Sequence, residues 1–141
     1  MPKVLLMKHL PPKVLLVDDD EVYLFAAGKT IEATGLADSV DVRNNGQEAI
    51  DYLINLMANG IELPDVIFID INMPVMDGWE FLEKYRELMG ERASDIKIYI
   101  LSSSVDKNDI QRSKQFDCVA EYIIKPVYKG KFTEILGGSP A

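Results

Sequence analysis

Five polar side chains follow apolar runs of the sequence and could do chemistry together: Asp18, Asp19, Asp70, Ser102 and Lys125. Three carboxylates brought close together repel one another, so such a group needs a cation among them. Oxygen ligands that leave room for water and phosphate oxygens suit Mg²⁺ (or Mn²⁺). Lys125 would add a second positive charge, and the Ser102 hydroxyl could donate to a phosphoryl oxygen.

The chemistry that fits this set is phosphoryl transfer onto a carboxylate. A carboxylate can attack phosphorus and form an acyl phosphate, while a metal ion and a lysine neutralise charge on the transferred group. Asp70 directly follows the apolar run Val66–Ile69, at the point where such a strand leaves the core. A carboxylate at the end of a strand buried on both faces is costly unless something compensates its charge.

Alternating strand and helix patterns position these residues. Apolar runs rich in β-branched residues predict strands at 12–17, 39–42, 66–69, 96–101 and 118–124. Apolar residues at helical spacing predict helices at about 22–34, 47–57, 78–89, 106–115 and 128–136. Asp20 is expected to cap the first helix, and Gly35 to end it.

Five strand–helix repeats predict an α/β fold, with parallel strands and helices on both faces of the sheet. Open sheets of this class bind ligands at the carboxyl ends of their strands. The five polar residues are therefore expected to converge on one rim of the sheet, although they lie far apart in the sequence.

Composition argues against several classes of protein. The chain has 141 residues, enough for one domain with a sizeable core. Its formal net charge is −8 and its pI is near 4.6, so no nucleic-acid partner is expected. No membrane contact is expected either, because no apolar run approaches the roughly 20 residues needed to span a bilayer. The single cysteine, Cys118, is expected to be buried, and a reducing cytoplasm is the expected compartment.

Motifs at the strand ends carry a family resemblance: Val17-Asp18-Asp19, Ile69 to Pro74 with Asp77-Gly78, Leu101-Ser102, and Tyr122 to Pro126. In this order they resemble the receiver domain of two-component response regulators, over about residues 12–136. The resemblance implies a flavodoxin-like (βα)5 three-layer sandwich, whose parallel five-stranded sheet has the order 2-1-3-4-5. Such a domain is a phosphoacceptor signalling protein rather than an enzyme, although it assists its own phosphorylation and dephosphorylation.

The resemblance also implies roles for individual residues at the rim. Asp70 would accept a phosphoryl group from a sensor histidine kinase or a phosphotransfer protein. Asp19, Asp70 and the backbone carbonyl of Asn72 would hold Mg²⁺, with Asp18 assisting through a water molecule.

A conformational switch is a further implication of the resemblance. Ser102 would move toward the phosphoryl group, which Lys125 contacts, and Tyr122 would rotate inward behind it; a static core role is the alternative for Tyr122. The surface formed by the fourth helix, fifth strand and fifth helix would then change. That surface is the expected contact for a downstream protein target, or for a second copy of the chain. The Lys125-Pro126 peptide bond is expected to be cis.

Short segments flank the predicted domain of residues 12–136. Residues 1–11 form an N-terminal extension that repeats the Pro-Lys-Val-Leu-Leu sequence of 12–16. The extension contains His9, for which no catalytic role is expected. Residues 137–141 form a tail with no room for an output domain, so the output is expected to be protein–protein contact.

Two other functions are compatible with this fold. A receiver-like module could bind a protein partner without phosphate, but the intact five-residue set argues against it. A flavodoxin-like cofactor binder would need a phosphate-cradling loop after the first strand, where this chain has acids.

Two residues near the motifs raise expectations of their own. Ser103 occupies a position where the receiver family usually has Ala or Gly, a departure that could alter the lifetime of the acyl phosphate. Trp79 is expected to be a partly exposed helix residue.

Overall fold

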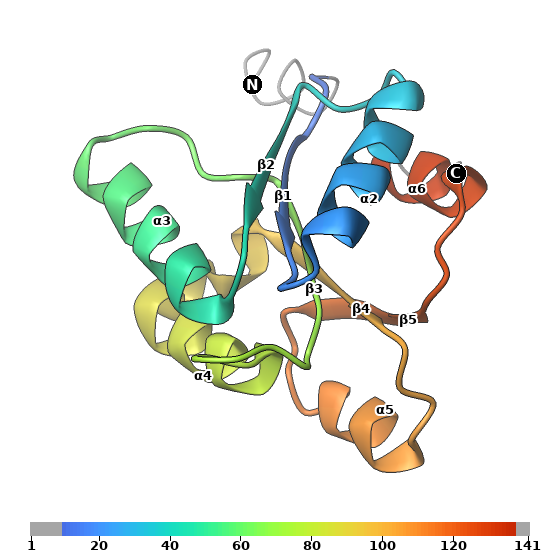
Figure 1. The fold of residues 1–141 in the computed structure, drawn as a ribbon. Coiled ribbons are helices and arrows are strands. Elements are labelled where there is room, and N and C mark those ends of the chain that lie inside the picture. Colours follow the sequence, from blue (N-terminus) through green and yellow to red (C-terminus); the bar gives the residue numbers. More distant parts are fainter. Residues whose placement is uncertain (1–9, 138–141) are drawn as a thin grey trace.

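Five parallel strands form one sheet in the order β2-β1-β3-β4-β5 (Figure 1). The computed structural model describes residues 10–137; His9 with the first copy of the N-terminal repeat, and residues 138–141 of the predicted tail, lie outside them. The strands are β1 (Lys13–Val17), β2 (Ser39–Arg43), β3 (Val66–Ile69), β4 (Lys97–Ser102) and β5 (Val119–Ile124). The expected strand order 2-1-3-4-5 is confirmed.

Helices cover both faces of the sheet and make a three-layer, flavodoxin-like fold (Figure 1). They are α2 (Glu21–Ala33), α3 (Gly46–Ala58), α4 (Gly78–Met89), α5 (Lys107–Ser113) and α6 (Lys129–Leu136). A short 3-10 helix, η1 (Gly90–Asp95), follows α4 and was not expected from the sequence. As predicted, the Asp20 side chain caps α2 by accepting from two backbone N–H groups.

Alternate residues of each central strand face the two helical layers. In β1, Val14 and Leu16 pack into the core under α2 and α6, whereas Leu15 and Val17 pack under α3 and α4. All four residues of β3 are buried in the same alternating way. The central strands are therefore apolar on both faces, and polar side chains are left to the strand ends.

Trp79 is buried, so the expectation of a partly exposed residue is wrong. The residue is only 7% exposed. The indole stacks on Phe116, with ring centroids 6.1 Å apart, and the Arg112 guanidinium lies 4.7 Å from the indole ring. The contact joins α4 to residues of α5 and of the segment that follows it.

Two apolar residues of α2, Val22 and Phe25, are exposed although they fit the helical spacing. The inward face of the helix is made by the smaller set Leu24, Ala27 and Ile31. Within residues 10–137, no helix is long and apolar enough to cross a bilayer.

Candidate functional site

The carboxyl ends of four strands bring the chemically active residues to one rim of the sheet. Asp18 follows β1, Asp70 follows β3, Ser102 ends β4 and Lys125 follows β5. Backbone hydrogen bonds fix these ends: the Asp70 N–H donates to the Val17 carbonyl at 3.0 Å, and the Lys125 N–H to the Ser102 carbonyl at 2.8 Å. The backbone at Asp70 and at Lys125 is thus held by the adjacent strand.

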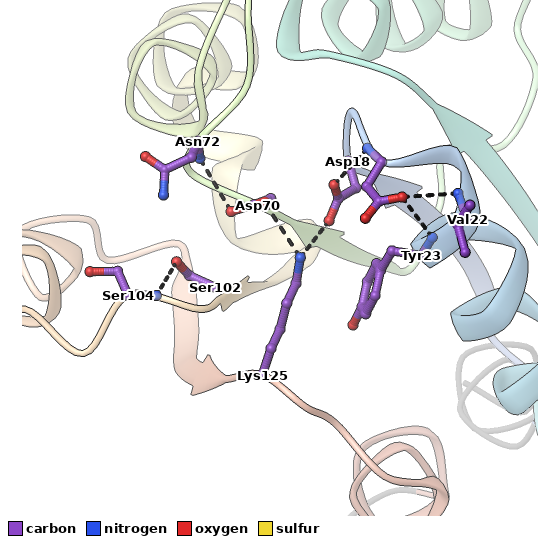
Figure 2. Close-up of polar contacts among 9 residues, drawn as sticks. Asp18, Val22, Tyr23, Asp70, Asn72, Ser102, Ser104 and Lys125 are labelled. Atoms are coloured by element: carbon purple, nitrogen blue, oxygen red, sulfur yellow. Dashed lines mark hydrogen bonds and ion pairs between the residues drawn. The ribbon is translucent and has the colours of Figure 1, made fainter.

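The Lys125 ammonium lies between two carboxylates (Figure 2). Its Nζ donates to Asp18 Oδ2 at 2.7 Å and to Asp70 Oδ2 at 3.4 Å. The Lys125, Asp18 and Asp70 side chains are 14%, 4% and 12% exposed, so this charge cluster is largely shielded from water. The Lys125-Pro126 peptide bond is cis, as expected.

A third carboxylate, that of Asp19, completes an acidic cluster with Asp18 and Asp70. One oxygen of each residue lies within 4.8 Å of the others. Asp18 is buried, Asp70 is largely buried and Asp19 is exposed, so the cluster opens to solvent on the Asp19 side. Hard oxygen donors at this spacing fit a divalent cation such as Mg²⁺.

Burial and charge shift the titration of both partners in the ion pair. Burial raises the pKa of Asp70, and the negative charge of Asp18 raises it further. The positive charge of Lys125 and the hydrogen bond from the Asn72 N–H lower it, but the net pKa of Asp70 lies above its ordinary value. Burial alone would lower the pKa of Lys125. The hydrogen bond to Asp18 and the charges of Asp70 and Asp18 outweigh it, so the net pKa of Lys125 is raised.

The loop after Asp70 is fixed by close backbone contacts. The Asn72 N–H donates to Asp70 Oδ1 at 3.2 Å, which orients the carboxylate. A Cβ at Gly78 would lie 2.7 Å from both the Asp70 carbonyl oxygen and the Ile71 Cα, so a side chain there would force the backbone to shift. Asp77 caps α4 in a capping box with the residue three positions on. These contacts give the Asp77-Gly78 motif a structural reason.

Ser102 and Tyr122, the expected switch residues, are joined through Ser104. The Ser102 hydroxyl is buried and accepts from the Ser104 N–H at 3.1 Å. The Tyr122 hydroxyl donates to the Ser104 carbonyl at 2.8 Å. Ser103 lies between them and is exposed. The sequence indicated Ser102 and Tyr122, but nothing in it indicated their shared partner.

Tyr23, in the first turn of α2, is a neighbour of the site that sequence reasoning missed (Figure 2). The Lys125 Nζ lies 4.0 Å from the centroid of its ring. No signal in the sequence separates Tyr23 from the other apolar residues of this helix.

Many known proteins are similar to this chain in sequence or in fold. Residues 14–137 match the family model of the response regulator receiver domain. A two-component response regulator from Cytophaga hutchinsonii is 29% identical with a TM-score of 0.83, and the match covers 92% of this chain and 96% of that one. The bacteriophytochrome response regulator RtBRR is 30% identical with a TM-score of 0.74, over 94% of this chain and 81% of that one.

Similar sequences also occur within longer proteins. The probable methanogenesis regulatory protein FilR2 of Methanothrix harundinacea is 28% identical over 81% of this chain, which spans 72% of that protein. The sensor histidine kinase CheAY of Helicobacter pylori is 30% identical over 84% of this chain, which spans only 14% of that protein.

The region that matches the family model contains all four strand ends of the rim, from Asp18 to Lys125. The fold, the strand order and the acidic cluster agree with that match. The chain therefore belongs to the family of response regulator receiver domains, the signalling domains of two-component systems.

Proposed function

We propose that Asp70 accepts a phosphoryl group from a sensor histidine kinase or a phosphotransfer protein, in a reaction that requires Mg²⁺ (or Mn²⁺). Phosphoryl acceptance is the general function of the receiver family. The observation that carries the proposal for this residue is the Lys125 ammonium, which lies between Asp18 and Asp70 with Asp19 beside them.

Asp70 acts as the nucleophile in the proposed reaction. One carboxylate oxygen forms a bond to phosphorus while the P–N bond of a donor phosphohistidine breaks. The electron pair of that bond returns to the departing imidazole, and an aspartyl acyl phosphate remains. The Lys125 ammonium and the Ser102 hydroxyl can donate to the phosphoryl oxygens. Water later attacks the phosphorus, which breaks its bond to the Asp70 oxygen, restores the carboxylate and releases inorganic phosphate.

The proposed metal ligands are Asp19, Asp70 and the backbone carbonyl of Asn72, with Asp18 acting through water. A divalent cation held there supplies positive charge that offsets the negative charge of the phosphoryl oxygens. The three clustered carboxylates support this assignment, because their mutual repulsion would be relieved by a cation.

The proposed output is a change in the surface formed by α5, β5 and α6. Ser102 and Tyr122 are both tied to the loop that precedes α5, so displacement of either would disturb the start of that helix. We propose that a downstream protein, or a second copy of the chain, reads this surface. The proposed functional unit is residues 12–136, in the reducing cytoplasm, with no nucleic-acid or membrane partner.

The test compares two variants at opposite ends of β3, Asp70→Asn and Asp65→Asn. Each protein is incubated with Mg²⁺ and a small acyl phosphate donor, and its intact mass is measured. We expect the wild type and Asp65→Asn to gain one phosphoryl group, and Asp70→Asn to gain none. Removing Mg²⁺ with EDTA should abolish the gain.

The competing function is a protein-interaction module that works without phosphate. No mass gain in the wild type, together with no metal-dependent change in Trp79 fluorescence on adding beryllofluoride, would favour that module. Undiminished labelling of Asp70→Asn would place the acceptor elsewhere.

A further inference from the structure

We infer that Tyr23 is a positioning residue, whose aromatic face holds the Lys125 ammonium in place to contact the phosphoryl group on Asp70. The inference rests on the proposed function of Asp70. It concerns how the lysine is aimed, a question that the carboxylate contacts alone do not answer.

Three groups surround the Lys125 ammonium, which has three N–H donors. The Nζ atom lies 2.7 Å from Asp18 Oδ2 and 3.4 Å from Asp70 Oδ2. The third group is the Tyr23 ring, whose centroid is 4.0 Å from Nζ, well within the range of a cation–π contact. Figure 2 shows the ring beside the lysine side chain.

The uncharged ring can hold the lysine without competing for it. A third carboxylate would bind the ammonium more strongly and reduce the charge available to a phosphoryl group. An aromatic face attracts a cation more weakly, so it restricts the position of Lys125 while leaving its charge available. Holding a catalytic charge in its working position lowers the barrier, because less ordering remains to be done during the reaction.

Local structure fixes the ring itself. The Tyr23 N–H donates to the Asp20 side chain that caps α2, at 3.1 Å, and the side chain packs against the apolar layer under α2 and α6. Its hydroxyl is buried, and among the described residues it is the one buried side-chain oxygen or nitrogen without a hydrogen-bond partner. The hydroxyl therefore does not hold Lys125, and the ring face is the part of the side chain that makes the contact.

The first test distinguishes the effect of the aromatic ring at position 23 from the effect of a bulky apolar side chain there. Tyr23→Leu keeps an apolar side chain and removes the ring, so we expect metal-dependent labelling by a small acyl phosphate donor to slow about tenfold, which equals about 1.4 kcal/mol. Tyr23→Phe keeps the ring and should restore most of the rate. The matched control is Phe25→Leu, which removes an exposed cation–π contact with Lys29 on the same helix and should leave the rate unchanged.

The second test changes the ring's charge distribution at nearly constant volume. Phenylalanine analogues with increasing numbers of ring fluorines are incorporated at position 23, because each fluorine weakens the negative face of the ring. We expect the logarithm of the labelling rate to fall stepwise with fluorine number. A residue that only fills space would give a flat series.

A third measurement needs no phosphorylation. The Lys125 side-chain protons next to Nζ should show an upfield ring-current shift by NMR in the metal-free wild type and in Tyr23→Phe, and lose it in Tyr23→Leu. A wild-type rate for Tyr23→Leu, or a flat fluorine series, would overturn the role of Tyr23 while leaving Asp70 as the acceptor. An unlabelled wild type that still shows the shift would overturn the proposed function instead.

Discussion

Strand β3 has a carboxylate at each end, and the two have very different surroundings. Asp65, before the strand, is exposed and accepts the Lys13 backbone N–H at 2.8 Å. Asp70, after the strand, is largely buried and faces Lys125. Only the strand residues separate them, so the direction of the strand, rather than residue type, decides which carboxylate enters a reactive cluster.

The lysines at the two ends of the sheet repeat this difference. The Lys13 Nζ lies 3.4 Å from Glu62 in a pair exposed to solvent. Such a pair contributes little, because water and salt screen it. Lys125 lies among carboxylates shielded from water, where the same charges interact more strongly and are more costly to leave unpaired.

Replacing Lys125 or Lys13 by alanine should give the largest difference in stability between the two ends of the sheet. Lys125→Ala leaves Asp18 and Asp70 without their cation, so we expect the free energy of unfolding to fall by about 3 kcal/mol in metal-free buffer at neutral pH. Lys13→Ala should change it by less than about 1 kcal/mol. Urea denaturation in EDTA measures both. Equal losses would show that the two ends of the sheet do not differ as described.

Mg²⁺ should stabilise the protein through the carboxylate at the Asp70 end of β3 and not through the one at the Asp65 end. At a concentration 100 times its Kd, a ligand that binds only the folded protein stabilises it by about 2.7 kcal/mol. We expect this gain in the wild type and in Asp65→Asn, and a much smaller gain in Asp70→Asn, which lacks a proposed ligand. Thermal unfolding across a Mg²⁺ titration gives the values. A full gain in Asp70→Asn would remove that residue from the metal site.

Two glycines test whether the rim also depends on close backbone packing. Gly78→Ala would place a Cβ 2.7 Å from the Asp70 carbonyl, so we expect a loss of about 2 kcal/mol. Gly28→Ala in α2 meets no atom within 4 Å, and should stabilise the protein by about 0.5–1 kcal/mol through helix propensity. Chemical denaturation compares them, and a neutral Gly78→Ala would mean that the loop can relax.

The pH dependence of stability should reveal the burial of Asp70. Because the pKa of Asp70 is raised in the folded protein, the folded state binds this proton more tightly than the unfolded chain does. As pH rises from the ordinary aspartate pKa of 3.8 through the raised pKa of Asp70, the metal-free wild type therefore loses stability relative to Asp70→Asn. Above that window the difference should stay constant. A difference that does not vary with pH would contradict the shift.

The convergence of the polar residues on one rim could be predicted, because the carboxyl ends of parallel strands all lie on the same edge of the sheet. Asp18, Asp70, Ser102 and Lys125 each follow or end an apolar run, and such runs can be recognised in the sequence. The roles of these residues in phosphoryl transfer stay predictions.

Contacts between segments could not be predicted in the same way. Trp79 is buried because Phe116, from a distant segment, stacks on it. Tyr23 faces the lysine because packing sets the rotation of α2 about its axis, and a helical pattern with Val22 and Phe25 on the same helix does not define that rotation.

The long sequence separations between Lys125 and its two carboxylate partners have a consequence for synthesis of the protein. Lys125 meets Asp18 across 107 positions and Asp70 across 55. As the chain leaves the ribosome, both carboxylates emerge well before the lysine, which follows β5, the last strand in the sequence and an edge strand of the sheet. A partly made domain would therefore carry the acids without their cation. Under the proposed function, a newly made chain becomes able to receive a signal only once its sheet is complete.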